Sequence, residues 1–286
     1  MAVYKRGYQR YQGELTGHAT RLMVMPRFAW ERLFKQRLVV ILLAVSLIWP
    51  LLCGAFIYVA NHADLLKSFG GEIPKMFSIN GKFFLVFMNT QSVFAVLLAA
   101  LAGPGLIAPD LANNALPLYF SRPLSRTDYV VSRLAVLVGM LSFVTWVPGL
   151  VLFSMQVGMA GWTWLTINWY LGAGVFIGFA SWILIVSMVA LASSAYVKWR
   201  IIAGALVLGF FFILAGVAEM VNKVLRVDWG TLFNPARSIY HLWCALLGVD
   251  APDGPGPLAC GVTLALFVFF LVLVLERKLR PVEVVS

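Results

Sequence analysis

The polar segment 109–133 holds the densest group of side chains in this sequence that could bind a partner or take part in chemistry. Its charged and large apolar members are Asp110, Leu118, Tyr119, Phe120, Arg122, Arg126 and Arg133. No nucleophile in the sequence has a base at a recognisable spacing. The segment therefore carries no pattern that is typical of catalysis.

Patterns for catalysis and phosphate binding are also missing from the rest of the sequence. The three histidines, His18, His62 and His241, fall outside the long apolar stretches. Ser181, in GFASW, is interpreted as a small residue that allows close helix packing. No glycine-rich phosphate loop is present. The chain is therefore predicted not to be an enzyme and to bind no cofactor or metal of its own.

The three cysteines, Cys53, Cys244 and Cys260, do not have the spacing of metal ligands. Cys53 lies in an apolar stretch, where a small packing residue is expected. Cys244 and Cys260 fall toward the same predicted side of the membrane, which leaves open both a disulfide between them and two free thiols.

A second polar group, Asn89, Thr90, Gln91 and Ser92, interrupts a long apolar stretch. Two interpretations remain open for it. The four side chains could line a path for a transported molecule, or they could form hydrogen bonds that hold neighbouring helices together.

These side chains must be positioned by an all-α, membrane-spanning fold. Hydrophobic residues make up 61% of the chain, charged residues 12%, and the mean hydropathy is +0.88. A bilayer requires about 20 apolar residues per helix, and a backbone in lipid must satisfy its own hydrogen bonds. Six helical spans are expected, over residues 38–60, 83–108, 134–160, 165–192, 201–220 and 258–275.

The positions of lysine and arginine predict the orientation, because cytoplasmic flanks of spans retain positive charge. With the N-terminus inside, eight basic residues precede the first span, and three, two and three more follow in the 2–3 connection, the 4–5 connection and the C-terminus. Six of the 22 fall on the other side. Both termini are therefore predicted to be cytoplasmic. This asymmetry also accounts for the net charge of +10, so nucleic-acid binding is not expected.

Residues 1–37 form the predicted cytoplasmic N-terminal region, in which no secretory signal peptide is expected. Within it, residues 23–37 place Met23, Trp30, Leu33 and Phe34 on one helical face and Glu31, Arg32, Lys35 and Gln36 on the other. Such a pattern is typical of a helix that lies in the headgroup region. The alternative is a positively charged flank of the first span.

The spans contain almost no ionisable side chains, which usually mark proton relays and ion paths in membranes. Glu219, near the end of the fifth span, is the one exception. A proton-driven transporter is therefore disfavoured. A sodium-coupled carrier could use backbone oxygens instead, and it is less favoured rather than excluded.

Segment 109–133 also has local signals for a helix, a break and a second helix. Pro123 cannot continue a helix that begins near Ala108. Ser125 and Asp128 have the spacing of a capping box, which starts a new helix. The alternative is that these signals only end the second span and begin the third.

The same residues carry a resemblance to the permease subunits of ABC-2 type ABC transporters. Members of that family have an acidic residue after span two, a Gly-Thr-Leu-like step, a turn ending in Ser-x-Pro, a Ser-Arg pair and a Gly-Lys pair. The matching positions here are Asp110, Asn114-Ala115-Leu116, Ser121-Arg122-Pro123, Ser125-Arg126 and Ser132-Arg133. The spacing is kept, whereas several identities differ and Pro117 is an addition.

The resemblance implies a six-span domain over residues 38–286, with an external, partly re-entrant region at 221–257, for which an ordinary external loop is the alternative. Segment 109–133 would dock on a soluble ATPase subunit, present in two copies, which binds the ATP and Mg. The resemblance gives the charged contacts to Asp110, Arg122 and Arg126 and the buried apolar anchor to Leu118, Tyr119 and Phe120. A second permease copy would complete the path, and the complex would be an exporter in the cytoplasmic membrane of a prokaryote. The alternatives are a non-transporting membrane scaffold that recruits a cytosolic partner, and a self-contained carrier or channel.

Overall fold

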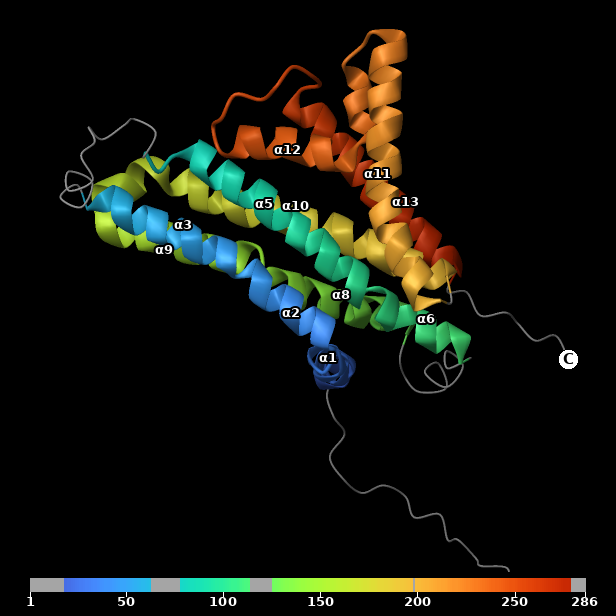
Figure 1. Ribbon diagram of the computed structural model, residues 1–286. Helices are drawn as coiled ribbons and strands as arrows, with labels where there is room; N and C mark the ends of the chain where they lie inside the picture. Colours follow the sequence, from blue (N-terminus) through green and yellow to red (C-terminus); the bar gives the residue numbers. More distant parts are fainter. Residues whose placement is uncertain (1–17, 63–77, 114–124, 198, 279–286) are drawn as a thin grey trace, which may run out of the picture.

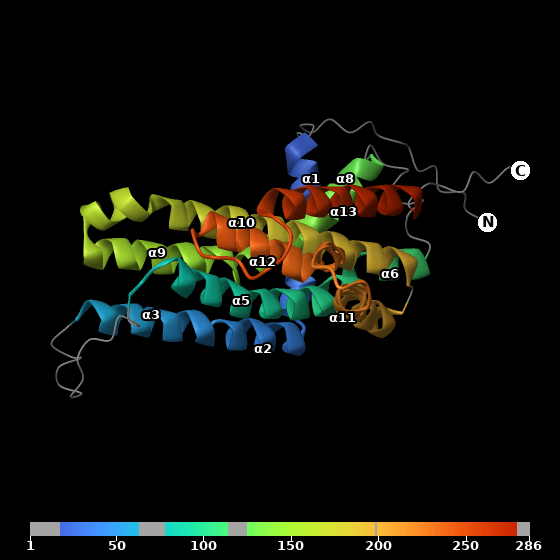
Figure 2. The same cartoon turned by 90° about the horizontal axis from the view of Figure 1, so that it is seen from above.

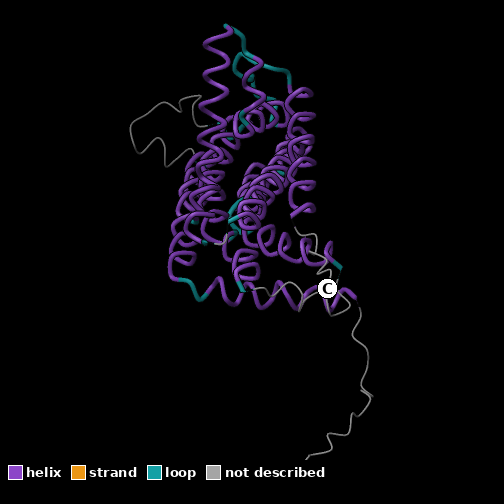
Figure 3. Tube along the Cα trace, turned by 90° about the vertical axis from the view of Figure 1, so that its right-hand side faces the viewer, coloured by secondary structure: helices purple, strands orange, loops and turns teal. Residues whose placement is uncertain are grey.

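The computed structural model describes residues 18–62, 78–113, 125–197 and 199–278, and within these ranges every regular element is a helix (Figures 1 and 3). The elements are α1 (His18–Phe34), α2 (Arg37–Ser46), α3 (Ile48–Asn61), α5 (Gly81–Ala102), α6 (Pro104–Ala112), α8 (Arg126–Ser142), α9 (Trp146–Ala160), α10 (Trp162–Tyr196), α11 (Arg200–Leu225), the 3-10 helix η2 (Trp229–Phe233), α12 (Pro235–Leu246) and α13 (Pro257–Lys278). The expected all-α class is confirmed for these residues.

Six helical segments are long and apolar enough to cross a membrane, and each overlaps one of the six predicted spans. They are Arg37–Asn61, Gly81–Ala112, Thr127–Ala160, Trp162–Tyr196, Arg200–Leu225 and Pro257–Lys278. The chain is thus a polytopic membrane protein by the length and composition of its helices.

Three of these segments consist of two helices with a break between them, a feature that the hydropathy pattern does not predict. The first break, at Leu47, precedes Pro50. Proline has no N–H, so the carbonyl of Ser46, four residues earlier, loses its intrahelical donor. The other two breaks are next to Pro104 and Pro148. The prolines therefore mark the points at which these spans are interrupted.

Helix α10 is the centre of the bundle, because it packs against α5, α6, α8, α9, α11, α12 and α13. Glycines on α10 allow this close packing. A Cβ at Gly172 would come within 2.9 Å of Phe153, and one at Gly178 would come within 2.7 Å of Trp243. Helices α2, α3, α11 and α13 cover the centre and leave large apolar faces exposed, as expected of surfaces that contact lipid.

Helix α12 lies over α10 and α5, between α11 and α13 in the sequence (Figures 1 and 2). Asn234 caps its start, since the side-chain oxygen accepts from the backbone N–H groups of Ala236 and Arg237. Trp243 is buried and donates from Nε1 to the carbonyl of Gly178 at 3.0 Å. Twelve residues of helix span only about 18 Å, so α12 packs on the bundle without crossing it. This helix lies in the segment for which re-entrant pieces are predicted.

Helix α1 runs crosswise to the spans at one end of the bundle (Figures 1 and 2). It ends at Phe34, and the predicted single helix over 23–37 is divided between α1 and the start of α2. Leu33 is buried, Trp30 is partly buried, and Met23 and Phe34 are exposed. The predicted apolar face of α1 is therefore only partly covered by the bundle.

The three cysteines are buried free thiols. Of the two possibilities for Cys244 and Cys260, the structure therefore has the free thiols.

Candidate functional site

The second span bends into a short terminal helix, α6, next to the segment singled out in the sequence. Gly103 ends α5 and Pro104 begins α6. A Cβ at Gly103 would lie 2.6 Å from the Cβ of Ala190 on α10, so only glycine permits this close approach. Pro104 occupies the first helical turn, where a missing N–H costs nothing. The sequence Gly-Pro thus fixes where α5 stops and where α6 starts.

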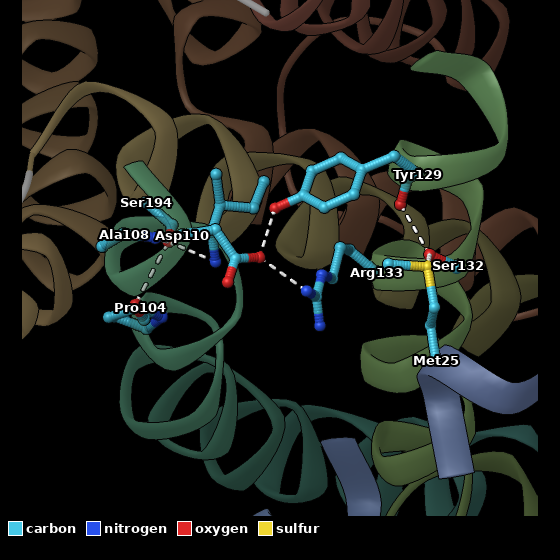
Figure 4. A network of polar contacts seen from close by, with 9 residues as sticks. Met25, Pro104, Ala108, Asp110, Tyr129, Ser132, Arg133 and Ser194 are labelled. Carbon is cyan, nitrogen blue, oxygen red and sulfur yellow. Dashed lines mark hydrogen bonds and ion pairs between the residues drawn. The ribbon is translucent and has the colours of Figure 1, made fainter. Parts of the chain in front are cut away.

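Ser194 of α10 holds the first turn of α6 in place (Figure 4). Its hydroxyl oxygen accepts from the backbone N–H groups of Ile107 and Ala108, at 3.2 and 2.9 Å. The same hydroxyl donates to the carbonyl of Pro104 at 3.2 Å. Ser194 is fully buried. One side chain on α10 therefore forms hydrogen bonds with three backbone groups of α6 near its start.

The last turn of α6 carries Asp110, which binds two side chains of α8 (Figure 4). Oxygen Oδ2 of Asp110 accepts from the hydroxyl of Tyr129 at 2.7 Å and from Nη2 of Arg133 at 2.6 Å. Tyr129 and Arg133 are four residues apart and so share one face of α8. The Arg133 guanidinium also lies 5.1 Å from the centre of the Tyr129 ring. The three side chains form one compact polar cluster, termed here the Asp110 cluster.

The Asp110 cluster is shielded from solvent. The side chains of Asp110 and Arg133 are 15% and 10% exposed, and Tyr129 is 1% exposed. Removing one partner from a shielded pair leaves an uncompensated charge, which costs much more than losing a surface ion pair. The cluster is therefore a firm connection between the end of the second span and the start of the third.

The start of α8 is fixed by the predicted capping box, which the structure confirms. Asp128 donates its backbone N–H to the hydroxyl of Ser125 at 3.1 Å, and Ser125 donates its backbone N–H to the Asp128 carboxylate at 3.0 Å. The Ser125 and Thr127 hydroxyl groups are 2.7 Å apart. Helix α8 thus begins immediately after segment 114–124.

Helix α1 joins the same region from the other side of α8. Trp30 donates from Nε1 to the carbonyl of Val136 at 2.9 Å, and its ring packs where a side chain at Gly139 would stand. The Ser132 hydroxyl donates to the carbonyl of Tyr129 at 2.7 Å, and its oxygen lies 3.6 Å from the sulfur of Met25 (Figure 4). Helices α1, α6, α8 and α10 are therefore linked in series at one end of the bundle.

The predicted partner-binding residues divide into two groups. Asp110 and Arg133 meet each other within the chain, whereas Leu118, Tyr119, Phe120 and Arg122 lie outside the described residues. Arg126 is the first residue of α8, and the structure does not describe its side chain. Neither Tyr129 nor Ser194 is among the site residues predicted from the sequence. The i, i+4 spacing of Tyr129 and Arg133 could have indicated that Tyr129 belongs to the site. No local signal in the sequence indicates the role of Ser194.

The polar group of the second span also divides in two. Gln91 is fully buried and donates from Nε2 to the carbonyl of Ser46 at 2.9 Å, which is the carbonyl that Pro50 leaves without a donor. The buried Ser92 donates to the carbonyl of Asn89 within its own helix. Asn89 itself is exposed and Thr90 is half-buried. The geometry of Gln91 favours helix-to-helix bonding, and Asn89 remains available to a partner or a passing molecule.

Chemically, the described site consists of a shielded ion pair and a set of backbone caps, and the described residues contain no grouping of metal ligands. A comparison of the chain with models of known protein families finds no match, and a comparison with curated protein sequences finds none either.

Proposed function

We propose that this chain is the membrane-spanning subunit of an ATP-driven exporter of the ABC-2 type, located in the cytoplasmic membrane of a prokaryote. Two copies would form the path, and two soluble ATPase subunits would bind ATP and Mg. The observation that carries the proposal is the Asp110 cluster, which ties together the helices on both sides of segment 114–124. The sequence resemblance of segment 109–133 supports the same conclusion.

A partner that binds segment 114–124 acts on both spans at once. The segment connects α6 directly to the capping box of α8, and the Asp110 cluster prevents the two helices from separating. When the segment moves, the ends of spans two and three therefore move together. The hydrogen bonds from Ser194 connect α6 to the central helix α10, so α10 is displaced with them.

ATP drives such a device by binding one arrangement of the ATPase subunits better than the other. A ligand shifts a two-state equilibrium only by its difference in affinity for the two states. The coupling is reciprocal, so the free energy by which ATP shifts the affinity for the transported molecule equals that by which the transported molecule shifts the affinity for ATP. In this proposal Arg122 and Arg126 supply charged contacts with the ATPase, and Leu118, Tyr119 and Phe120 supply the apolar anchor. Asp110 and Arg133 do not contact the ATPase in this proposal; as positioning residues they hold α6 and α8 together on either side of segment 114–124.

Asn89 and Thr90 are the proposed path residues. They lie on an outward face of α5, beside the exposed Val86 and Val93. An amide exposed at the depth of a span is costly against lipid, so a second copy or a transported molecule is the favoured neighbour. A path so poor in charge suits an apolar or amphiphilic substrate.

The test uses Tyr129→Phe, which removes the hydroxyl that binds Asp110 and keeps the ring. A hydrogen bond to a charged group contributes about 1.5–3 kcal/mol, so the link between α6 and α8 weakens while the contact surface of the segment is unchanged. ATPase co-purification should persist, whereas ATP turnover in reconstituted vesicles should lose its dependence on substrate. Tyr196→Phe is the matched control, because the Tyr196 hydroxyl makes only a 3.5 Å contact with Val274.

A companion variant, Tyr119→Ala, separates transporter from scaffold. Loss of the ATPase from detergent extracts is expected for a coupling surface. If the retained partner is a protein without ATPase activity, the scaffold interpretation holds. If Tyr119→Ala and Arg126→Glu both keep the ATPase and full coupled transport, segment 109–133 is only a connector and the proposal is wrong.

A further inference from the structure

A groove of about 660 Å³ opens where the starts of α2 and α11 meet the end of α5. This volume lies within the range of sites that bind small organic ligands. The walls include Leu38, Val39, Leu101, Ile201 and Leu208, so most of the lining is apolar. Leu38 and Ile201 are 67% and 87% exposed. The groove therefore opens toward the membrane rather than into the closed centre of the bundle.

Two arginines stand at the same place as these apolar walls. Arg37 is the first residue of the first span and Arg200 is the first residue of the fifth, and both line the groove. Arg200 donates from Nη2 to the side-chain oxygen of Gln36 and, at 3.2 Å, to the carbonyl of Leu101. Both bonds use one nitrogen, and a guanidinium has five N–H donors. Arg200 is thus held in position and has donors left for a ligand.

The positive charge in the groove is not balanced within the described part of the chain. No described carboxylate forms an ion pair with Arg37 or Arg200. Arg32, on α1, adds further positive charge near Arg200. The N-cap residues of α2 and α11 provide no side-chain acceptor for the first backbone N–H groups. These helix starts add to the positive potential.

We propose that this groove binds one anionic phospholipid, with its phosphate on Arg37 and Arg200 and an acyl chain along Leu38, Leu101 and Leu208. Both arginines lie at the ends of spans, which is the depth of lipid headgroups. In the proposed topology they face the cytoplasmic leaflet, where basic residues attract anionic lipids. An apolar groove that carries paired arginines fits an amphiphile better than a soluble anion, which would leave the apolar walls unused.

The lipid would connect the first and fifth spans at this end, where α2 and α11 each pack on α5 rather than on each other. Arg200 already bridges the α1–α2 junction and the end of α5. A phosphate shared with Arg37 adds a second bridge between the first and fifth spans. The proposal does not depend on the ATPase partner, so its failure would leave the proposed transport function untouched.

The experiment titrates the purified, delipidated full chain with phosphatidylglycerol and counts bound lipid by native mass spectrometry. Phosphatidylcholine carries the same phosphodiester on a lipid without net charge, and glycerol 3-phosphate carries a phosphate, as a monoester, without acyl chains. One phosphatidylglycerol per chain should bind, more tightly than phosphatidylcholine, and glycerol 3-phosphate should not compete. A basic residue at an anionic surface is worth about 1 kcal/mol, so Arg37→Gln should weaken phosphatidylglycerol binding roughly fivefold.

Arg37→Gln is the cleanest variant, because Arg37 makes no hydrogen bond or ion pair among the described residues. Ala205→Phe fills the groove without changing charge, and it should weaken both phospholipids. Arg277→Gln removes a basic residue at the end of α13, outside the groove, and should change nothing. Equal binding of phosphatidylglycerol to the wild type, Arg37→Gln and Ala205→Phe would overturn the proposal. Competition by glycerol 3-phosphate would also overturn it, since the site would then take a soluble anion.

Discussion

Gln91 and Asn89 stand two positions apart on α5 and have opposite surroundings. Gln91 is buried against the first span, where it replaces the hydrogen bond that Pro50 cannot provide to Ser46. Asn89 is exposed. Two amides that look equivalent in the sequence therefore have different physical roles, and single substitutions can separate them.

Gln91→Leu should destabilise the protein, because the carbonyl of Ser46 loses its donor in a place that water does not reach. The expected loss is about 0.6–2 kcal/mol, the range found for polar contacts between membrane helices. Asn89→Leu should leave stability unchanged and reduce transport. Thermal unfolding in detergent, together with a transport assay in vesicles, measures both. If Asn89→Leu is as unstable as Gln91→Leu, the division between the two amides is wrong.

Helix α12 contains a buried histidine, which makes the stability of this helix depend on pH. His241 is 2% exposed. Burial, and then the nearby positive charge of Arg237, lower the pKa of His241 below its ordinary value. Gly254 lies against the imidazole ring, where a side chain would come within 2.9 Å of it. The folded state therefore holds His241 in its neutral form.

Acidification should loosen α12. Well above about pH 6.5, the ordinary pKa of histidine, the side chain is neutral in both the folded and unfolded states, so the free energy of unfolding does not depend on its titration. As the pH falls below that value, the unfolded state takes up a proton that the folded state resists, and stability decreases. Thermal unfolding between pH 7.5 and 5.5 should show this slope in the wild type and a smaller slope in His241→Gln. Equal slopes would show that another group is responsible.

The whole molecule has one end that gathers its basic and polar connections. The Asp110 cluster, the crosswise helix α1 and the Arg200 contacts with the α1–α2 junction and α5 all lie there (Figure 1). The charge asymmetry of the sequence independently predicts that this end is cytoplasmic. The Asp110 cluster, helix α1 and the Arg200 contacts are therefore all predicted to lie on the cytoplasmic side of the membrane.

Reporter fusions test this orientation directly. Fusions after Ser125 and Ser286 should report the cytoplasm, and fusions after Gly70 and Gly254 should report the external side, because the positive charge is concentrated at the ends of the spans near Ser125. An alkaline phosphatase and a fluorescent protein, used in parallel, give opposite signals at each site and control for expression. A cytoplasmic signal at Gly254 would remove the six-span topology.

The sequence predicts those parts of the fold that depend on neighbouring residues. Six apolar stretches and the capping box at Ser125 are set by length and spacing alone, and the structure contains them. The breaks at Leu47 and Gly103 lie beside prolines that the sequence shows, but the helix that packs against each break cannot be read from it. The meeting of Asp110 with Tyr129, and the caps from Ser194, join positions 19 and more than 80 residues apart. No local pattern specifies such pairs, so the candidate site could be located from the sequence but its internal contacts could not.

The contact between Trp243 and Gly178 has a consequence for how the chain is assembled during synthesis. The tryptophan lies 65 residues after the glycine, and proteins are made from the N-terminus. Gly178 is therefore synthesised before Trp243, and the notch at this glycine is uncovered until α12 has been made. Docking of Trp243 then closes the notch. Correct packing of the central helix α10 thus has to wait for a helix that comes later in the chain.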